Sequence, residues 1–254
     1  MVEQITIEIM KFRNLIYILF ATLTISFVGC ERDYDDNTQI TYYPTFVFEG
    51  DAVIVHPLGT PYTDAAVSAT EDGEALPVTV TVTGEMTGYS GTTVDTDVAD
   101  KYTITYSATN SDGYDGVETR IVYVSPVNGD LVTSLEGLYS ADVQRGPAFA
   151  VSAQYTGMQY IFILKTGDNT YSISDALGGY YYIGRVYGYA YAAVGSVITV
   201  SGASYSISQS TIPGFGNVVD VSEFVVDPVS KVISFTGTGD FANGVFHVQL
   251  YQVQ

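Results

Sequence analysis

The sequence is poor in the residues on which most nucleic-acid-binding proteins and many enzymes depend. Its 254 residues include one cysteine, two histidines, no tryptophan, and nine Lys and Arg against 28 Asp and Glu. The resulting net charge of −19 argues against nucleic acid as a partner, because phosphate contacts rely on Lys and Arg. Such an acidic surface favours a soluble extracellular protein, or one whose ligand is neutral or cationic.

The few reactive side chains also argue against catalysis. One thiol excludes a disulfide framework, and His56 and His247 do not form the HExxH pair of a zinc site. Both histidines lie in strand-like runs without a nucleophile elbow nearby, so no activated nucleophile can be singled out. We therefore expect no catalytic residue, no metal and no cofactor.

Helical periodicity is absent as well. No long stretch after residue 30 repeats apolar positions at the spacing of an amphipathic helix. Tyrosine, valine and threonine are abundant instead, with 22 tyrosines in the chain. The length allows two modest domains. We predict an all-β protein with units at residues 45–125 and 131–254 and a linker at residues 126–130.

The single cysteine follows an export signal. Two basic residues precede an apolar run at residues 15–28, which is shorter than the roughly 20 residues that span a bilayer core. Gly29 stands directly before Cys30, and this arrangement resembles the bacterial lipobox, in which the cysteine receives a diacylglyceryl group before cleavage. Phe27 departs from the usual leucine of that motif. We expect a signal peptide at residues 1–29 and lipidation at Cys30; an ordinary signal peptide or an uncleaved anchor is the alternative.

Residues on either side of the signal add two expectations. Glu3 and Glu8 are acidic where a signal should be basic, so we expect translation to start at Met10. Four of residues 31–36 are acidic, and residues 30–44 read as a lipidated acidic tether. This stretch is similar to the one that sends Bacteroidetes lipoproteins across the outer membrane. The similarity implies a protein anchored by lipid in the outer membrane and facing the exterior; a plain solvated tether is the alternative.

Alternating strands fill the first unit. Residues 78–83 place valine on one face and threonine on the other, and residues 102–108 alternate Tyr, Ile and Ala with Thr and Ser. Residues 121–124 close the unit as its last strand. With turn-forming clusters between them, these runs predict a sandwich of about seven strands.

The same unit resembles a known family through four segments: Leu58–Asp64, Val67–Ala69, Val94–Thr96 and Tyr102–Thr109. In this order they look like the bacterial immunoglobulin-like domain, which recurs in surface lipoproteins. Residues 65–66 and 99–100 depart from its usual turns but not from its core. The resemblance implies an immunoglobulin-like β-sandwich that serves as a spacer or adhesion module, and therefore display rather than chemistry.

The second unit offers about nine strand candidates. The clearest are residues 160–165, 187–191, 197–201, 218–226, 232–236 and 245–253. In the last of them, Phe246, Val248 and Leu250 fall on one face. The pattern predicts a second antiparallel β-sandwich or a small barrel. The region looks like the uncharacterised C-terminal domain that follows immunoglobulin-like modules in Bacteroidetes lipoproteins.

Tyrosines crowd one stretch of the second unit, where they make up six of the twelve residues from 180 to 191. Read as a strand, residues 187–191 put three rings on one face, with only glycine and alanine opposite. Flat rings beside approachable backbone could stack on sugar rings, with hydroxyl and charged groups giving hydrogen bonds. The candidate ligand-binding residues are Tyr180, Tyr182, Arg185, Tyr187, Tyr189, Tyr191 and Asp175. The alternative is that the row of rings packs into the interior.

Together these features predict a non-enzymatic cell-surface lipoprotein that binds or captures glycans. Its partners would be the membrane, through Cys30, and a polysaccharide. A structural or adhesion lipoprotein that binds another envelope protein is the alternative, and buried rings at residues 180–191 would favour it. A hydrolase would require a cleft lined by two facing carboxylates.

Overall fold

The computed structural model describes residues 40–253. Helical structure within this range is limited to three short turns, Ala153–Tyr155, Tyr180–Gly184 and Tyr189–Tyr191, so the all-β prediction is confirmed. None of the described helices is long and apolar enough to cross a membrane. The predicted signal, the lipidation site Cys30 and tether residues 30–39 lie outside the described residues.

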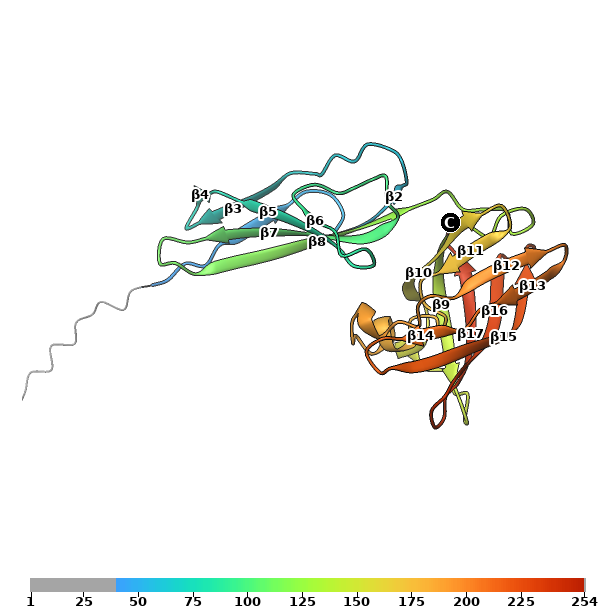
Figure 1. The fold of residues 1–254 in the computed structure, drawn as a ribbon. Helices are drawn as coiled ribbons and strands as arrows, with labels where there is room; N and C mark the ends of the chain where they lie inside the picture. The colour runs from blue at the N-terminus through green and yellow to red at the C-terminus, as the bar shows by residue number, and fades with distance from the viewer. Residues whose placement is uncertain (1–39, 254) are drawn as a thin grey trace, which may run out of the picture. The chain divides into compact units, whose positions relative to one another are not determined.

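Two sheets form a sandwich in the first unit (Figure 1). One sheet has the order β1-β3-β4, with β1 (Thr45–Phe48), β3 (Val67–Glu71) and β4 (Glu74–Leu76). The other has the order β2-β8-β7-β5-β6, with β2 (Val53–Pro57), β8 (Asp115–Ser125), β7 (Asp100–Thr109), β5 (Thr79–Gly84) and β6 (Ser90–Gly91). Neighbouring strands are antiparallel except β2 and β8, which are parallel.

The core of this sandwich follows the predicted alternation. Tyr102, Ile104 and Tyr106 of β7 are buried and pack with Val82 of β5 and Val122 of β8. The threonines of β5 face solvent, as the period-two pattern requires. Sequence alternation was therefore sufficient to place the apolar face of both strands.

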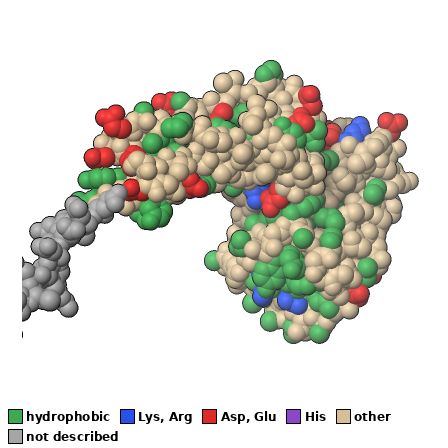
Figure 2. Space-filling view, turned by 60° about the vertical axis from the view of Figure 1, so that its left-hand side comes forward, with side chains coloured by type: hydrophobic (Ala, Val, Ile, Leu, Met, Phe, Trp, Pro, Cys, Tyr) green, Lys and Arg blue, Asp and Glu red, His purple; other side chains and the backbone are tan. Residues whose placement is uncertain are grey.

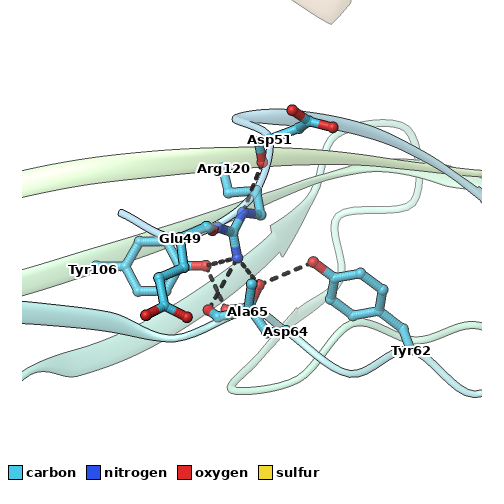
Figure 3. A network of polar contacts seen from close by, with 7 residues as sticks. All are labelled: Glu49, Asp51, Tyr62, Asp64, Ala65, Tyr106 and Arg120. Atoms are coloured by element: carbon cyan, nitrogen blue, oxygen red, sulfur yellow. Dashed lines mark hydrogen bonds and ion pairs between the residues drawn. The ribbon is translucent and has the colours of Figure 1, made fainter. Parts of the chain in front are cut away.

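One buried cation ties the loops of the sandwich to its core. Arg120 of β8 is fully buried, and its guanidinium donates to the carboxylate of Asp64 and to the backbone oxygens of Glu49, Asp51 and Ala65 (Figure 3). These acceptors lie in the segments before β2 and before β3. One side chain thereby supplies hydrogen-bond donors to three backbone oxygens that have no partner in a sheet. Buried polar groups need such partners.

Aromatic side chains complete this network. The Arg120 guanidinium lies 4.4 Å from the centroid of the Phe48 ring, and Asp64 accepts hydrogen bonds from the hydroxyls of Tyr106 and Tyr62. Burial and the hydrogen bond to Asp64 raise the pKa of Tyr62 to about 12. Sequence analysis did not single out Arg120, because nothing local distinguishes it from a surface arginine.

The second unit is one nine-stranded antiparallel sheet with the order β13-β12-β11-β10-β9-β17-β16-β15-β14. Its strands are β9 (Gly137–Arg145), β10 (Met158–Gly167), β11 (Thr170–Ile173), β12 (Val197–Ser201), β13 (Ser204–Ile207), β14 (Ser210–Ile212), β15 (Asn217–Asp227), β16 (Val232–Gly239) and β17 (Val245–Gln252). The edge strands β13 and β14 are consecutive in the chain, so the sheet must curl to bring its edges together (Figure 1). Of the two predicted arrangements, this half-barrel corresponds to the barrel.

The hollow side of the half-barrel holds its core. Phe246, Val248 and Leu250 of β17 are buried as predicted, and they pack with Tyr139 of β9 and Leu177. Residues 197–201 form a strand with the predicted bounds. The predicted strand at residues 187–191, in contrast, is wrong, and the segment around it forms the candidate site described next.

Candidate functional site

A long connection between β11 and β12 is closed at its base by a carboxylate. Asp175 Oδ1 accepts hydrogen bonds from the backbone N–H of Leu177 at 2.8 Å and of Ala193 at 3.0 Å. The N–H of Ala176 also donates to the Ala193 oxygen at 2.8 Å. These bonds join the two ends of residues 176–193, which we call the aromatic loop.

Backbone geometry explains why the aromatic loop is not a strand. Gly179 (φ 86°), Val186 (φ 57°) and Gly188 (φ 88°) all have positive φ, whereas a strand requires φ near −120°. The N–H groups of Gly184 and Arg185 bond the oxygens five residues earlier, which makes a single π-helical turn. The alternation of Tyr with Gly and Ala imitates a strand pattern, but the three rings of residues 187–191 do not form a row.

Gly178 allows the loop to lie directly against the sheet. It has φ +62°, and a Cβ there would lie 2.6 Å from Cγ1 of Val248 and 2.9 Å from Cγ2 of Val143. We expect Gly178→Ala to lower the free energy of unfolding by about 2–3 kcal/mol, because overpacking adds to the strain of a left-handed backbone. Urea denaturation would measure the loss. Gly195→Ala is the control, since Gly195 has φ +88° with open space around it; equal losses would contradict the packing explanation.

The tyrosines of the loop divide between interior and surface. Tyr180, Tyr181 and Tyr182 are buried, Tyr189 and Tyr191 are half-buried, and Tyr187 is 47% exposed. The Tyr182 ring packs edge-on against Tyr189, whose hydroxyl donates to the Ser174 oxygen at 3.4 Å. Of the predicted tyrosines, Tyr187 is exposed and Tyr189 and Tyr191 are half-buried, whereas Tyr180 and Tyr182 are buried and are not accessible to a ligand.

Asp175 is not a surface ligand. Its side chain is 1% exposed, so a glycan on the surface would not reach it. Burial raises its pKa from 3.8 to about 7, against the lowering effect of the backbone hydrogen bonds of Leu177, Ala193 and Gly179. Its role is to close the aromatic loop, and this corrects the predicted role in ligand binding.

Three rings form an exposed aromatic patch, which we define as Tyr187, Tyr191 and Phe215. Their centroids lie 4.7 to 6.3 Å apart, and Phe215 is 45% exposed. Phe215 comes from the turn between β14 and β15, where Gly214 lets the backbone pass close to the Tyr191 ring. Hydrophobic side chains gather on this unit with Lys and Arg beside them (Figure 2). The patch combines flat apolar faces with phenol hydroxyls.

Two arginines lie against the buried tyrosines that underlie the patch. The guanidinium carbons of Arg145 and Arg185 each lie 5.6 Å from the centroid of the Tyr180 ring, and Arg145 lies 5.2 Å from that of Phe246. Tyr155 stacks on Tyr180 with centroids 4.2 Å apart. Burial raises the pKa of Tyr180, but hydrogen bonds with Tyr155, Arg185 and Arg145 outweigh burial and hold that pKa below its ordinary value. The edge of the patch is therefore electropositive.

Comparison with known proteins places both units. Residues 46–124 match the family model of the Ig-like domain of bacterial surface proteins, and residues 128–252 match a model of C-terminal domains. The crystal structure of the lipoprotein BT2262 from Bacteroides thetaiotaomicron is similar, with 25% identity and a TM-score of 0.58 over 83% of this chain and 100% of that one. The chain is a relative of the Bacteroides surface lipoproteins. No curated protein matches it.

The family resemblance that sequence analysis derived from four segments is thus confirmed for this surface lipoprotein. Three contributors to its candidate site were missed: Tyr181, Phe215 and Arg145. Tyr181 lies in the tyrosine stretch and underlies Phe215 with centroids 5.1 Å apart. Phe215 lies in a Gly-containing turn and Arg145 ends a strand, so neither carries a local signal that links it to residues 180–191.

Apart from the aromatic patch, this surface lipoprotein has a cavity on the outer face of β9, β17 and β16. It has a volume of about 330 Å³, and its lining includes Asp142, Glu223 and His247. Asp142 accepts a hydrogen bond from the Gly157 N–H at 2.7 Å, and Glu223 accepts one from the Thr236 hydroxyl at 2.7 Å. The matches are to surface lipoproteins and not to an enzyme family.

Proposed function

We propose that this surface lipoprotein is anchored in the outer membrane through Cys30, faces the exterior, and captures glycans at the aromatic patch of its half-barrel. The observation that carries the proposal is the exposure of Tyr187 and Phe215 side by side, at 47% and 45%. Apolar ring faces contact the C–H faces of sugars, while hydroxyl and guanidinium groups bind sugar oxygens. The immunoglobulin-like unit acts as the spacer that presents the half-barrel.

A glycan array with the chain from residue 30, carrying Cys30→Ser to keep it soluble, tests this function. We expect Tyr187→Ala combined with Phe215→Ala to lower affinity roughly tenfold, because each aromatic contact contributes about 0.5–1.5 kcal/mol beyond its buried area. Tyr114→Ala, at a tyrosine that is 51% exposed in the first unit, is the matched control. Binding unchanged by the double substitution would remove the patch as the site.

The alternative function, docking of another envelope protein, is favoured by the burial of Tyr180, Tyr181 and Tyr182. Tyrosine, phenylalanine and arginine are also enriched at the centres of protein interfaces. It predicts no glycan affinity, together with a crosslinked envelope partner that the Tyr187→Ala and Phe215→Ala substitutions release.

A further inference from the structure

Cations are scarce in this protein, and two of the few in the second unit lie against the tyrosines that underlie the aromatic patch. Residues 131–253 contain four Lys and Arg: Arg145, Lys165, Arg185 and Lys231. Two of these four lie against the Tyr180 ring. The chain as a whole has a net charge of −19, so this local reversal of sign needs a physical reason.

Neither arginine forms an ion pair with a carboxylate in the described part of the chain. The ion pairs within residues 40–253 are Lys101 with Glu85 and Arg120 with Asp64, so no described carboxylate lies within ion-pair distance of Arg145 or Arg185. A charge withdrawn from water is usually paired with an opposite charge, and Arg145 is half-buried. Here the counter-charge is missing from the described chain, although the protein has acids in excess.

The two arginines differ in what they can offer a ligand. Arg145 donates from Nε to the Asn243 oxygen at 2.8 Å and from Nη2 to the Ala242 oxygen at 3.4 Å, so backbone carbonyls hold it in place. Arg185 is exposed; it donates a long hydrogen bond of 3.5 Å to the Tyr180 hydroxyl and also interacts with the Tyr187 hydroxyl. Most of the Arg185 donors therefore remain available, while Arg145 adds positive potential behind them.

We propose that the glycan bound at the aromatic patch is anionic, with a carboxylate or sulfate group on the Arg185 guanidinium and the sugar ring on Tyr187 and Phe215. The inference rests on the proposed function. A guanidinium binds such oxyanions through two parallel hydrogen bonds, which a neutral hydroxyl does not reproduce. Repulsion from the acidic remainder of the surface is screened beyond about 8 Å at physiological ionic strength, so the nearby arginines dominate at the patch.

The test compares oligogalacturonate with its carboxyl-reduced, neutral counterpart and with a sulfated glycosaminoglycan, using calorimetric titration of the chain from residue 30 with Cys30→Ser. We expect oligogalacturonate or the sulfated glycan to bind at least tenfold more tightly than the neutral polymer. Arg185→Gln should remove most of this preference, since a hydrogen bond to a charged group is worth about one to two decades in affinity. Lys165→Gln, the same loss of charge at an exposed lysine of β10, should leave it unchanged.

The outcomes separate the two claims. Equal binding of the charged and neutral polymers, or an anion preference that survives Arg185→Gln, would overturn the anionic ligand while leaving glycan binding intact. A preference lost equally in Lys165→Gln would also overturn it, because net charge alone would then explain the effect. Absence of binding to every glycan would overturn both the inference and the proposed function.

Discussion

The free energy of unfolding of the half-barrel should fall as the pH rises from about 4 to about 7, and Asp175→Asn should remove this dependence. The Asp175 carboxyl is buried, its Oδ2 has no hydrogen-bond partner in the described structure, and its pKa is raised from 3.8 to about 7. The native state therefore binds the proton more tightly than the unfolded state. The stabilisation is fully present below pH 3.8 and is lost as the pH rises through about 7.

The size of this effect follows from the shift. Each pKa unit corresponds to about 1.36 kcal/mol, so ionisation of Asp175 should cost about 4 kcal/mol. Asn keeps an acceptor for the N–H groups of Leu177 and Ala193 but carries no charge at any pH. Urea denaturation of both proteins at a series of pH values gives the difference, in which other titrating groups cancel. Asp220→Asn, at an exposed aspartate of β15, is the control. A wild-type pH dependence retained in Asp175→Asn would contradict the assignment.

Asp64→Ala should destabilise the immunoglobulin-like unit by about 3–5 kcal/mol. Arg120 is fully buried, and removal of its carboxylate partner leaves an uncompensated charge in the core. The Asp64 side chain is 29% exposed, so water entering the gap would place the loss near the lower end of this range. Hydrogen-exchange mass spectrometry reads the stability of residues 45–125 separately from that of the half-barrel.

Two further variants test whether the loss comes from the unpaired charge of Arg120. Asp51→Ala removes an exposed side chain but keeps the backbone oxygen that Arg120 binds, and it should change stability by less than about 0.5 kcal/mol. Asp64→Ala combined with Arg120→Met should recover part of the loss, because the buried charge disappears with its partner. A double variant less stable than Asp64→Ala would show that the guanidinium matters mainly through its bonds to loop carbonyls.

The alternation of apolar and polar residues within single strands could be predicted from the sequence. The faces of β7 and β17 were predicted correctly because a strand in a half-buried sheet exposes every second residue, whatever the rest of the chain does. The same logic failed at residues 187–191. There the alternation of Tyr with Gly and Ala is real, but Val186 and Gly188 take positive φ within a loop whose two ends are fixed by Asp175.

Contacts between residues that are far apart in the chain could not be predicted from the sequence. The Asp64 carboxylate and the backbone oxygens that Arg120 binds lie 55 to 71 residues away from it along the chain, so its burial has no local signature. Phe215 contacts the aromatic loop from the turn between β14 and β15, and Arg145 contacts it from the end of β9. The aromatic patch therefore could not be assembled from the tyrosine stretch alone, although that stretch correctly drew attention to the loop.

By itself, the sequence determined that the protein is all-β, that its first unit is immunoglobulin-like, and that it resembles Bacteroidetes surface lipoproteins, because composition, alternation and motifs are local properties. It also supplies the prediction of lipidation at Cys30. Only the tertiary structure decided which tyrosines are exposed, that Asp175 is internal, and that two arginines with no acidic partner among residues 40–253 lie beside Tyr180. The physical reason is that burial and electrostatic environment depend on neighbours that the fold, and not the chain order, brings into contact.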